Sequence, residues 1–211
     1  MVELGSWPVT DRNFNIDNWN LMETMVKLHQ EMSRSPLFNI FVTGDIKDSD
    51  VNIIVFDQGG LGMDDRDSYL KNGTFHFKKR TAYKQLMKDF SEELGADERG
   101  LQLMGEVFEF EKQLAKFTAS VEERRSFRSI YDTMTLKELA NRTNIDLSWL
   151  REFVEKAVLM GKGKMSGDER IVCYATTYMK KAFQAFTGLR KEVQVSVLLL
   201  ILEKNIGKIY R

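Results

Sequence analysis

The sequence predicts a mainly α-helical protein, a helical lobe that carries a small antiparallel β-hairpin at about residues 37–56. Apolar residues recur at steps of three and four in several long segments, which is typical of helices packed on one face. Two short runs rich in β-branched and aromatic residues flank a turn-rich stretch, which is typical of a hairpin. Because 43% of the 211 residues are hydrophobic, the chain has enough apolar surface for a core, and wholesale disorder is excluded.

The first helix and the hairpin are expected in the N-terminal part of the chain. Asp17 or Asn18 could cap the helix, because a short polar side chain can accept a hydrogen bond from a free N–H of the first turn. Pro36 ends the helical pattern. The expected elements are a helix at residues 21–32, strands at 37–43 and 51–56, and a turn at 44–50.

The remainder of the chain is expected to be largely helical. Gly95 is a stop signal for one helix, and Thr135 with Glu138 fits a capping box at the start of another. The apolar run at residues 193–202 is too short and too interrupted for a membrane span, so it predicts a buried helix or strand. The other expected elements are helical stripes at 83–94, 104–115, 147–158 and 178–186, and a short strand at 171–174.

Charge and composition exclude several classes of function. Lys plus Arg and Asp plus Glu each number 31, so the chain has no global electrostatic reason to bind nucleic acid or an anionic membrane. The N-terminus lacks a basic start followed by an apolar core, so neither a signal peptide nor a membrane anchor is expected within this sequence. Cys173 is the one cysteine, cannot form an internal disulfide, and is expected to be a buried core thiol.

No residue is nominated as catalytic or as a metal ligand. The two histidines, His29 and His76, do not begin an H-E-x-x-H motif, and His29 lies on an apolar stripe where a packed imidazole is expected. The acidic run at 45–50 lacks the carboxylate that a calcium loop needs at its twelfth position, which is Phe56. A second acidic cluster, Asp64, Asp65 and Asp67 around Arg66, is expected to be a solvated loop with local ion pairs.

Two glycine-containing segments have weak similarity to phosphate-binding loops. The segment at 58–62 lacks the third glycine of G-x-G-x-x-G and is followed by acidic residues that would repel a pyrophosphate. The segment at 161–164 lacks the spacing of a P-loop. Both are expected to be structural or surface loops.

Two glycosylation sequons are present, Asn72-Gly-Thr and Asn141-Arg-Thr. Asn72 and Asn141 are therefore candidate sites of N-glycosylation, which is meaningful only if the chain enters the secretory pathway.

A series of short motifs, taken in order, resembles the N-terminal region of the neprilysin and endothelin-converting-enzyme family of zinc metalloendopeptidases. The resemblance extends from about Gly5 to about Phe186. Its residues are Gly5-Ser-Trp-Pro-Val9, Leu37-Phe-Asn-Ile-Phe-Val42, Gly44-Asp-Ile-Lys-Asp-Ser-Asp50, the loop at 57–70, Phe108-Glu-Phe-Glu-Lys-Gln-Leu-Ala115, the segment at 131–139, Ser148-Trp-Leu150 and the segment at 171–179. The sequence departs from the family at Gly59 or Gly60, where the family usually has proline, and at Asp64-Asp65, where it usually has Pro-Ser. Residues 1–187 are assigned to the family region, and 188–211 to a divergent C-terminal tail.

The resemblance implies a function that belongs to a larger enzyme. In the family, zinc is bound by H-E-x-x-H and a later E-x-x-x-D segment, and the glutamate of the first motif activates a zinc-bound water. Neither motif, nor the substrate-positioning N-A-[FY] segment, is carried over onto this chain, so no cofactor is expected here although the full-length family uses zinc. The family's N-terminal segment helps to build a helical lobe that faces the zinc lobe across a cavity and limits which peptides reach the metal.

Three hypotheses follow. The first is the N-terminal part of a neprilysin-like enzyme that hydrolyses oligopeptides outside the cell, present here as a fragment or an incomplete gene product and inactive alone; its partners would be the catalytic domain and oligopeptides. Its location would be extracellular or a plasma-membrane ectodomain. The second is a non-catalytic peptide- or protein-binding module derived from that family. The third sets the resemblance aside and is a cytosolic helical scaffold.

Overall fold

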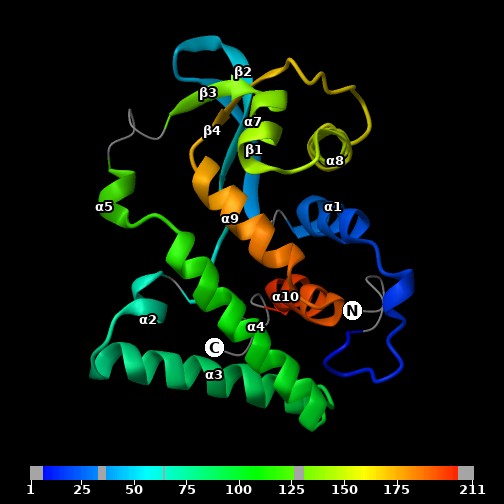
Figure 1. Cartoon of the computed structure of the whole chain (residues 1–211), viewed down its shortest axis with the longest axis vertical. Coiled ribbons are helices and arrows are strands. Elements are labelled where there is room, and N and C mark those ends of the chain that lie inside the picture. Colours follow the sequence, from blue (N-terminus) through cyan, green and yellow to red (C-terminus); the bar gives the residue numbers. More distant parts are fainter. Residues whose placement is uncertain (1–6, 33–36, 64, 126–130, 204–211) are drawn as a thin grey trace. The chain divides into compact units, whose positions relative to one another are not determined.

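The computed structural model describes residues 7–32, 37–63, 65–125 and 131–203, and it is mainly helical with one small sheet (Figure 1). The expected fold class is thereby confirmed. Pro36 and Asp64, named above, lie outside the described residues. The chain divides into two compact units. One, the helical unit, comprises Met1–Thr24, Leu61–Lys116 and Ala185–Arg211, and the other, the sheet unit, comprises Met25–Gly60 and Phe117–Gln184.

The helical unit is built around α4 (Glu98–Phe117), a 20-residue amphipathic helix. Its buried positions recur at steps of three and four, as expected for a helix that buries one stripe, and they include Leu103, Val107 and Leu114. Helix α3 (Thr74–Glu93) packs beside it, with the Tyr83 and Phe108 rings 6.2 Å apart. Gly95, at φ 90°, follows the end of α3 and confirms the expected stop.

Three further segments complete the helical unit. Helix α2 (Asp67–Leu70) follows the loop from the sheet, and a short 3₁₀ turn, η2 (Ile16–Asn18), precedes α1. Helix α10 (Lys191–Glu203) contains the expected apolar run, and its residues from Val193 to Leu200 are buried. The prediction of a buried element there is confirmed.

The N-terminal segment packs closely on α4. Trp7 is buried, its ring lies 6.4 Å from that of Phe90, and its carbonyl accepts from the N–H groups of Thr10 and Asp11. A Cβ added to Gly100 would lie 2.0 Å from the Val9 carbonyl oxygen. Only glycine therefore allows this approach of the chain to α4.

The sheet unit contains four strands in the order β1-β2-β4-β3. The hairpin of β1 (Phe38–Asp45) and β2 (Asp48–Gln58) is antiparallel, as predicted, with Phe38 opposite Gln58. Strand β4 (Arg170–Cys173), also predicted, pairs in parallel with the C-terminal half of β2 and antiparallel with β3 (Asp132–Thr135). The sequence analysis did not predict β3. The predicted hairpin is therefore one part of a larger mixed sheet, in which β4 and β3 follow β2.

The two faces of this sheet are covered differently. On one face Phe38 and Phe56 pack together, and the Phe38 ring meets Phe153 of α8 edge-on at 5.5 Å. On the other face Ile53, Val55 and Val172 form a small buried cluster on which Tyr131 and Tyr174 pack. Three helices lie wholly in this unit: α5 (Val121–Arg124), α7 (Leu136–Thr143) and α8 (Leu147–Phe153), which continues as the π-helical turn η3 (Val154–Val158). Most of α1 (Leu21–Met32) and most of α9 (Thr176–Thr187) also belong to it.

The starts of two helices can be compared with the N-caps that the sequence predicts. The predicted capping box of α7 is present: Glu138 N donates to Thr135 Oγ1 at 3.1 Å, and Thr135 N donates to the Glu138 carboxylate at 2.8 Å. The predicted cap of α1 is wrong. Helix α1 begins at Leu21, and Glu23 N donates to the Asn20 side chain at 3.2 Å, so Asn20 takes the role expected of Asp17 or Asn18.

Candidate functional site

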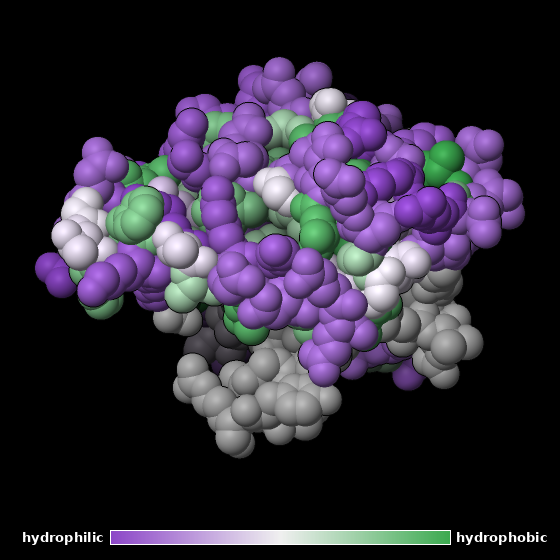
Figure 2. Space-filling view, turned by 90° about the horizontal axis from the view of Figure 1, so that it is seen from below, coloured by the Kyte–Doolittle hydropathy of each residue, from purple (hydrophilic) through white to green (hydrophobic). Residues whose placement is uncertain are grey.

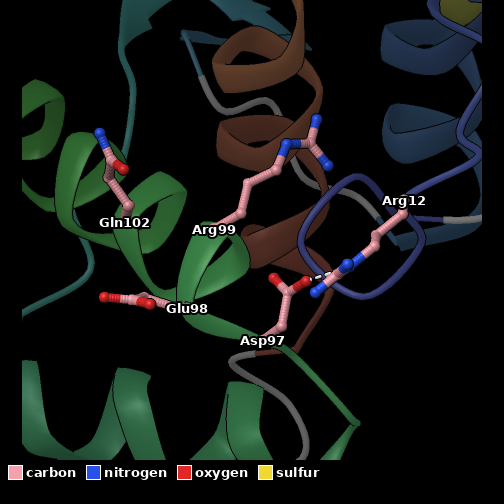
Figure 3. A pocket seen from close by; sticks show the side chains of 5 residues that line it. All are labelled: Arg12, Asp97, Glu98, Arg99 and Gln102. Carbon is pink, nitrogen blue, oxygen red and sulfur yellow. Dashed lines mark hydrogen bonds and ion pairs between the residues drawn. The ribbon is translucent and has the colours of Figure 1, made fainter.

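A charged pocket of about 490 Å³ opens on the helical unit at the start of α4 (Figure 3). Arg12 reaches it from the N-terminal loop, and the remaining lining residues are Asp97, Glu98, Arg99 and Gln102. Arg12 and Asp97 point toward each other and form an ion pair, while Arg99 extends toward α10. The pocket therefore joins segments that lie far apart in the sequence.

Asp97 is held as a carboxylate by two kinds of contact. Its Oδ1 accepts from Gly100 N at 2.9 Å, in the position of a helix N-cap, and its Oδ2 accepts from Arg12. The Gly100 N–H and then the Arg12 guanidinium keep the Asp97 pKa below its usual value, although burial acts in the opposite direction. Asp97 is thus a negative group held by the helix start, and its partner Arg12 is 76% exposed to solvent.

The second guanidinium of the pocket belongs to a chain of ion pairs. Arg99 Nη2 lies 2.8 Å from Glu192 Oε1, and Arg190 bridges Glu192 at 3.0 Å and Glu106 at 2.6 Å. These contacts join α4 to the start of α10. Since each side chain is partly exposed, water and salt screen the pairs, and each contributes little to stability.

The pocket can bind charged groups through its lining side chains. Its five lining side chains are guanidinium, carboxylate and amide groups, and none is the serine, cysteine or histidine of a nucleophilic constellation. A ligand carboxylate could replace Asp97 as the partner of Arg12, because this pair is exposed to solvent. These groups are suited to hydrogen bonds and ion pairs with a charged ligand.

Deeper in the helical unit, a buried carboxyl group is surrounded by tyrosines. Glu111, 5% exposed, accepts from the hydroxyl groups of Tyr69 and Tyr83, each 2.9 Å from its Oε2, and Tyr69 Oη accepts from Met63 N at 2.9 Å. Burial and then the Glu111 charge raise the pKa of both tyrosines. A Cβ at Gly62 would lie 1.9 Å from Tyr83 Oη, so the backbone at Gly62 is in close contact with this network.

In the sheet unit, the buried carboxylate of Asp45 and the partly buried carboxylate of Asp57 are paired with arginines. Arg124 binds both oxygens of Asp57, at 2.7 and 2.6 Å, and Asp45 accepts from Tyr131, from Lys47 N and from Arg170. The Tyr131 hydroxyl is the main cause that lowers the Asp45 pKa. The turn is shorter than the expected 44–50: Asp45 ends β1, Ile46 and Lys47 form the turn, and Asp48 begins β2.

The second acidic cluster pairs with lysines. Asp67 pairs with Lys71 at 2.7 Å and Asp65 with Lys79 at 3.4 Å. Burial opposes ionisation of Asp65, but hydrogen bonds from Ser68 and Lys79 outweigh it and lower the Asp65 pKa. Local ion pairing is confirmed for these two residues, with lysine partners that the sequence analysis did not name.

The other residues singled out in the sequence lie in separate settings. His29 is half-buried and meets Phe153 edge-on at 6.1 Å, and burial lowers its pKa. Cys173 is buried, with its sulfur 3.7 Å from that of Met179, and burial raises its pKa. Asn72 and Asn141 are both exposed, one in a loop and one in α7. Within the described parts of the chain, no three His, Cys, Asp or Glu side chains gather as a metal site requires.

Sequence reasoning did not predict the pocket. Asp97 could have been recognised as a helix cap, since it directly precedes α4. No sequence signal identifies Arg12, which is 85 positions from its partner.

The fold matches that of two bacterial proteins with solved structures. A zinc metalloprotease from Mycobacterium tuberculosis, solved with an inhibitor, aligns with a TM-score of 0.68 at 19% identity, over 87% of this chain and 28% of that one. PEPO from Lactobacillus rhamnosis aligns with a TM-score of 0.63 at 12% identity, over 84% of this chain and 27% of that one. At this level of identity the likeness establishes the fold alone.

Sequence similarity then identifies the family. The N-terminal model of peptidase family M13 matches residues 1–206, and the chain belongs to that family. Relatives include an endothelin-converting enzyme homolog of Locusta migratoria (35% identical, covering 86% of this chain and 24% of that protein), Neprilysin-3 of Drosophila melanogaster (31%, 85% and 23%) and human neprilysin (29%, 85% and 26%). The chain spans about a quarter of the length of these relatives. The resemblance to the N-terminal region of the neprilysin family is confirmed.

Proposed function

We propose that this chain forms the N-terminal, substrate-cavity-forming part of a neprilysin-like zinc metalloendopeptidase that hydrolyses oligopeptides. The observation that carries the proposal is the match of peptidase family M13 to residues 1–206, together with the fold shared with a bacterial zinc metalloprotease. In this proposal the chain shapes and limits access to a catalytic centre that another part of the enzyme supplies.

The zinc chemistry is assigned to the catalytic part and not to this chain. The 211 residues hold two histidines at positions 29 and 76, and neither belongs to an H-E-x-x-H motif. A zinc-activated water needs at least three protein ligands around an open position. The proposal therefore includes the expectation that the isolated chain hydrolyses no peptide.

The charged pocket supplies the peptide contacts in this proposal. Peptides carry charged termini and charged side chains, and Arg12 presents an exposed guanidinium that can exchange its partner. Arginine binds carboxylates through parallel hydrogen bonds, which fixes orientation as well as charge. Replacing Arg12 with Gln in the complete enzyme should raise KM for peptides with an acidic group more than for neutral peptides. A variant at Arg142, in the sheet unit, serves as the matched control.

The location proposed is extracellular, as a secreted protein or a plasma-membrane ectodomain. The support is the similarity to neprilysin and to an endothelin-converting enzyme homolog. Among the helices formed by the described residues, none combines the length and the apolar character needed to cross a bilayer.

Sequencing the transcript beyond the codon for Arg211 tests the proposal. A continuing reading frame that encodes H-E-x-x-H and E-x-x-x-D supports it. A verified stop with no such continuation contradicts the enzymatic role and favours the alternative, a non-catalytic peptide- or protein-binding module of the same family.

A further inference from the structure

The first turns of α3 expose two large aromatic side chains. Phe75 is 71% exposed and Phe77 is 63% exposed, and these are the two most exposed aromatic residues in the described parts of the chain. The Phe75 ring meets the His76 ring edge-on at 5.4 Å. Because the Cα–Cβ bonds of a helix tilt toward its N-terminus, the side chains of its first turns project toward and past its start. The two rings therefore stand in water at one end of α3.

The same segment is cationic, although the chain as a whole has no net charge. Residues 68–88 contain no Asp or Glu and six Lys or Arg residues, which are Lys71, Lys78, Lys79, Arg80, Lys84 and Lys88. Carboxylates outside this segment pair with four of them, as Asp67–Lys71, Asp65–Lys79, Lys84–Glu109 and Lys88–Glu92. In the part of the chain that the structure describes, no carboxylate pairs with Lys78 or Arg80. The positive charge beside the two rings is therefore only partly balanced.

Arg80 fixes the loop that precedes the two rings. Its Nη1 donates to the Ser68 carbonyl at 3.0 Å and to the Lys71 carbonyl at 2.8 Å. Both acceptors are neutral, so the guanidinium keeps its charge while it ties the loop to α3. In Figure 1 the start of α3 lies beside α2, and at the left of Figure 2 hydrophobic groups stand among hydrophilic ones. We call this surface the α3 patch, and its exposed residues are Lys71, Phe75, Phe77 and Lys78.

The composition of the α3 patch suits a lipid surface better than a protein partner. Lysine is depleted from the cores of protein–protein interfaces, where its ammonium group would lose its water. Helices that bind at the surface of a bilayer combine Phe, Leu or Trp with Lys and Arg. Their apolar side chains enter the boundary between headgroups and acyl chains, about 5 to 10 Å deep, while the ammonium groups reach the lipid phosphates. The α3 patch has both kinds of side chain at one end of one helix.

We propose that the α3 patch binds the surface of a phospholipid bilayer. Phe75 and Phe77 enter the layer beneath the headgroups, and Lys78 binds lipid phosphate groups. The zero net charge of the whole chain does not oppose this contact, because screening confines electrostatic attraction to charges within about 8 to 10 Å. The inference goes beyond the proposed peptidase role and does not depend on it.

Co-sedimentation of the purified full chain with lipid vesicles measures the binding. Vesicles of phosphatidylcholine and phosphatidylserine in equal parts should bind the wild type, and vesicles of phosphatidylcholine alone should bind it about tenfold more weakly, since the serine headgroup adds negative charge. The double variant Phe75→Ser, Phe77→Ser should lower the affinity by about tenfold or more. Lys78→Glu should lower it by about tenfold.

Two matched variants control for general changes in apolar surface and in charge. Leu86 is 59% exposed on the same helix but lies about 16 Å along its axis from Phe75, deeper than the expected insertion reaches. Lys191, exposed at the start of α10, gives the same change of net charge as Lys78 when it is replaced with Glu. Leu86→Ser and Lys191→Glu should both bind the vesicles as the wild type does.

Three results of the sedimentation would overturn the proposal. The first is no binding to either kind of vesicle, and the second is an equal loss of binding in Leu86→Ser. The third is binding that survives the loss of both rings, or that inorganic phosphate at the lipid phosphate concentration displaces. This third result would mean that charge alone acts and that any anion suffices.

Insertion of the aromatic side chains is tested separately with vesicles whose acyl chains carry bromine, which quenches tryptophan fluorescence on contact. Phe75→Trp should be quenched more than the wild type, which has three tryptophans of its own, and Leu86→Trp should not. No additional quenching in Phe75→Trp, or the same quenching in Leu86→Trp, would contradict insertion at the start of α3. Neither measurement involves peptide hydrolysis, so the proposed function and this inference can fail independently.

Discussion

The two units of this protein stabilise their buried and partly buried carboxyl groups in different ways. In the helical unit, Glu111 accepts hydrogen bonds from two neutral tyrosine hydroxyls. In the sheet unit, Asp57 is bound by both arms of the Arg124 guanidinium, and Asp45 by Arg170 and Tyr131. Ion pairs are present in both units, but the carboxyl group most deeply placed in the helical unit has neutral donors, and the two carboxylates of the sheet unit have guanidinium donors.

This difference predicts which changes should lower the stability of each unit. A packed network of neutral donors responds to changes in shape and to the loss of an acceptor, because stranded hydroxyls have no water to replace the lost partner. Partly exposed ion pairs respond to geometry, salt and pH, because water and counterions compete for them. Variants in each unit test that contrast.

The largest effect is expected from removal of the Glu111 carboxyl. Glu111→Ala strands the hydroxyls of Tyr69 and Tyr83 and leaves a cavity, so the free energy of unfolding should fall by about 3 kcal/mol. Urea denaturation measures it. Glu109→Ala, at an exposed position of the same helix, should change stability by less than about 0.5 kcal/mol. Equal effects of the two variants would contradict the buried network.

The next largest effect tests the packing of the N-terminal segment on α4. Gly100→Ala places a Cβ against the Val9 carbonyl and should destabilise by about 2 kcal/mol. Gly105→Ala, in the same helix with nothing within 4 Å of the new Cβ, should stabilise by about 0.5 to 1 kcal/mol. The opposite signs are measurable by thermal unfolding. If both variants were stabilising, the close approach of Val9 would be wrong.

A smaller effect is expected for the arginine of the sheet unit. Arg124→Lys keeps the charge but loses the second hydrogen bond to Asp57, so it should cost about 1 kcal/mol. Arg142→Lys, whose pair with Asp132 is about half exposed, should cost less than about 0.5 kcal/mol. The loss in Arg124→Lys should shrink at high salt, and an equal loss at all salt concentrations would argue against an ion pair.

The smallest effect is a pH dependence from His29 in the sheet unit. Burial lowers its folded-state pKa below 6.5, so the unfolded chain binds the proton more readily. The free energy of unfolding therefore has its full value above the unfolded-state pKa of 6.5. It decreases as the pH falls from there through the folded-state pKa. His29→Gln should show a smaller decrease in Tm between about pH 7.5 and about pH 5.5 than the wild type. An unchanged decrease would show that His29 is not responsible.

Local rules predicted the parts of the fold that depend on neighbouring residues. The capping box of Thr135 and Glu138, the stop at Gly95 and the hairpin all depend on residues within a few positions of each other. Strand β3 was missed because a four-residue strand has almost no periodicity. It also forms only by pairing with β4, which lies far along the chain: Asp132 pairs with Cys173, and Thr135 pairs with Arg170.

The same limit explains what could be predicted of the candidate site. The motif series led to the family because the order of many short segments carries that information. The pocket depends on an ion pair between Arg12 and Asp97, which only the folded helical unit brings together. The absence of H-E-x-x-H from the sequence could be read directly, and it underlies the proposal that catalysis resides outside this chain.

Peptidase activity of the purified chain tests the central claim most directly. The chain is incubated with oligopeptides and zinc, with and without a chelator, and its metal content is measured in parallel. The account predicts no chelator-sensitive hydrolysis and no stoichiometric zinc. Hydrolysis that the chelator stops, in material free of other proteases, would contradict it.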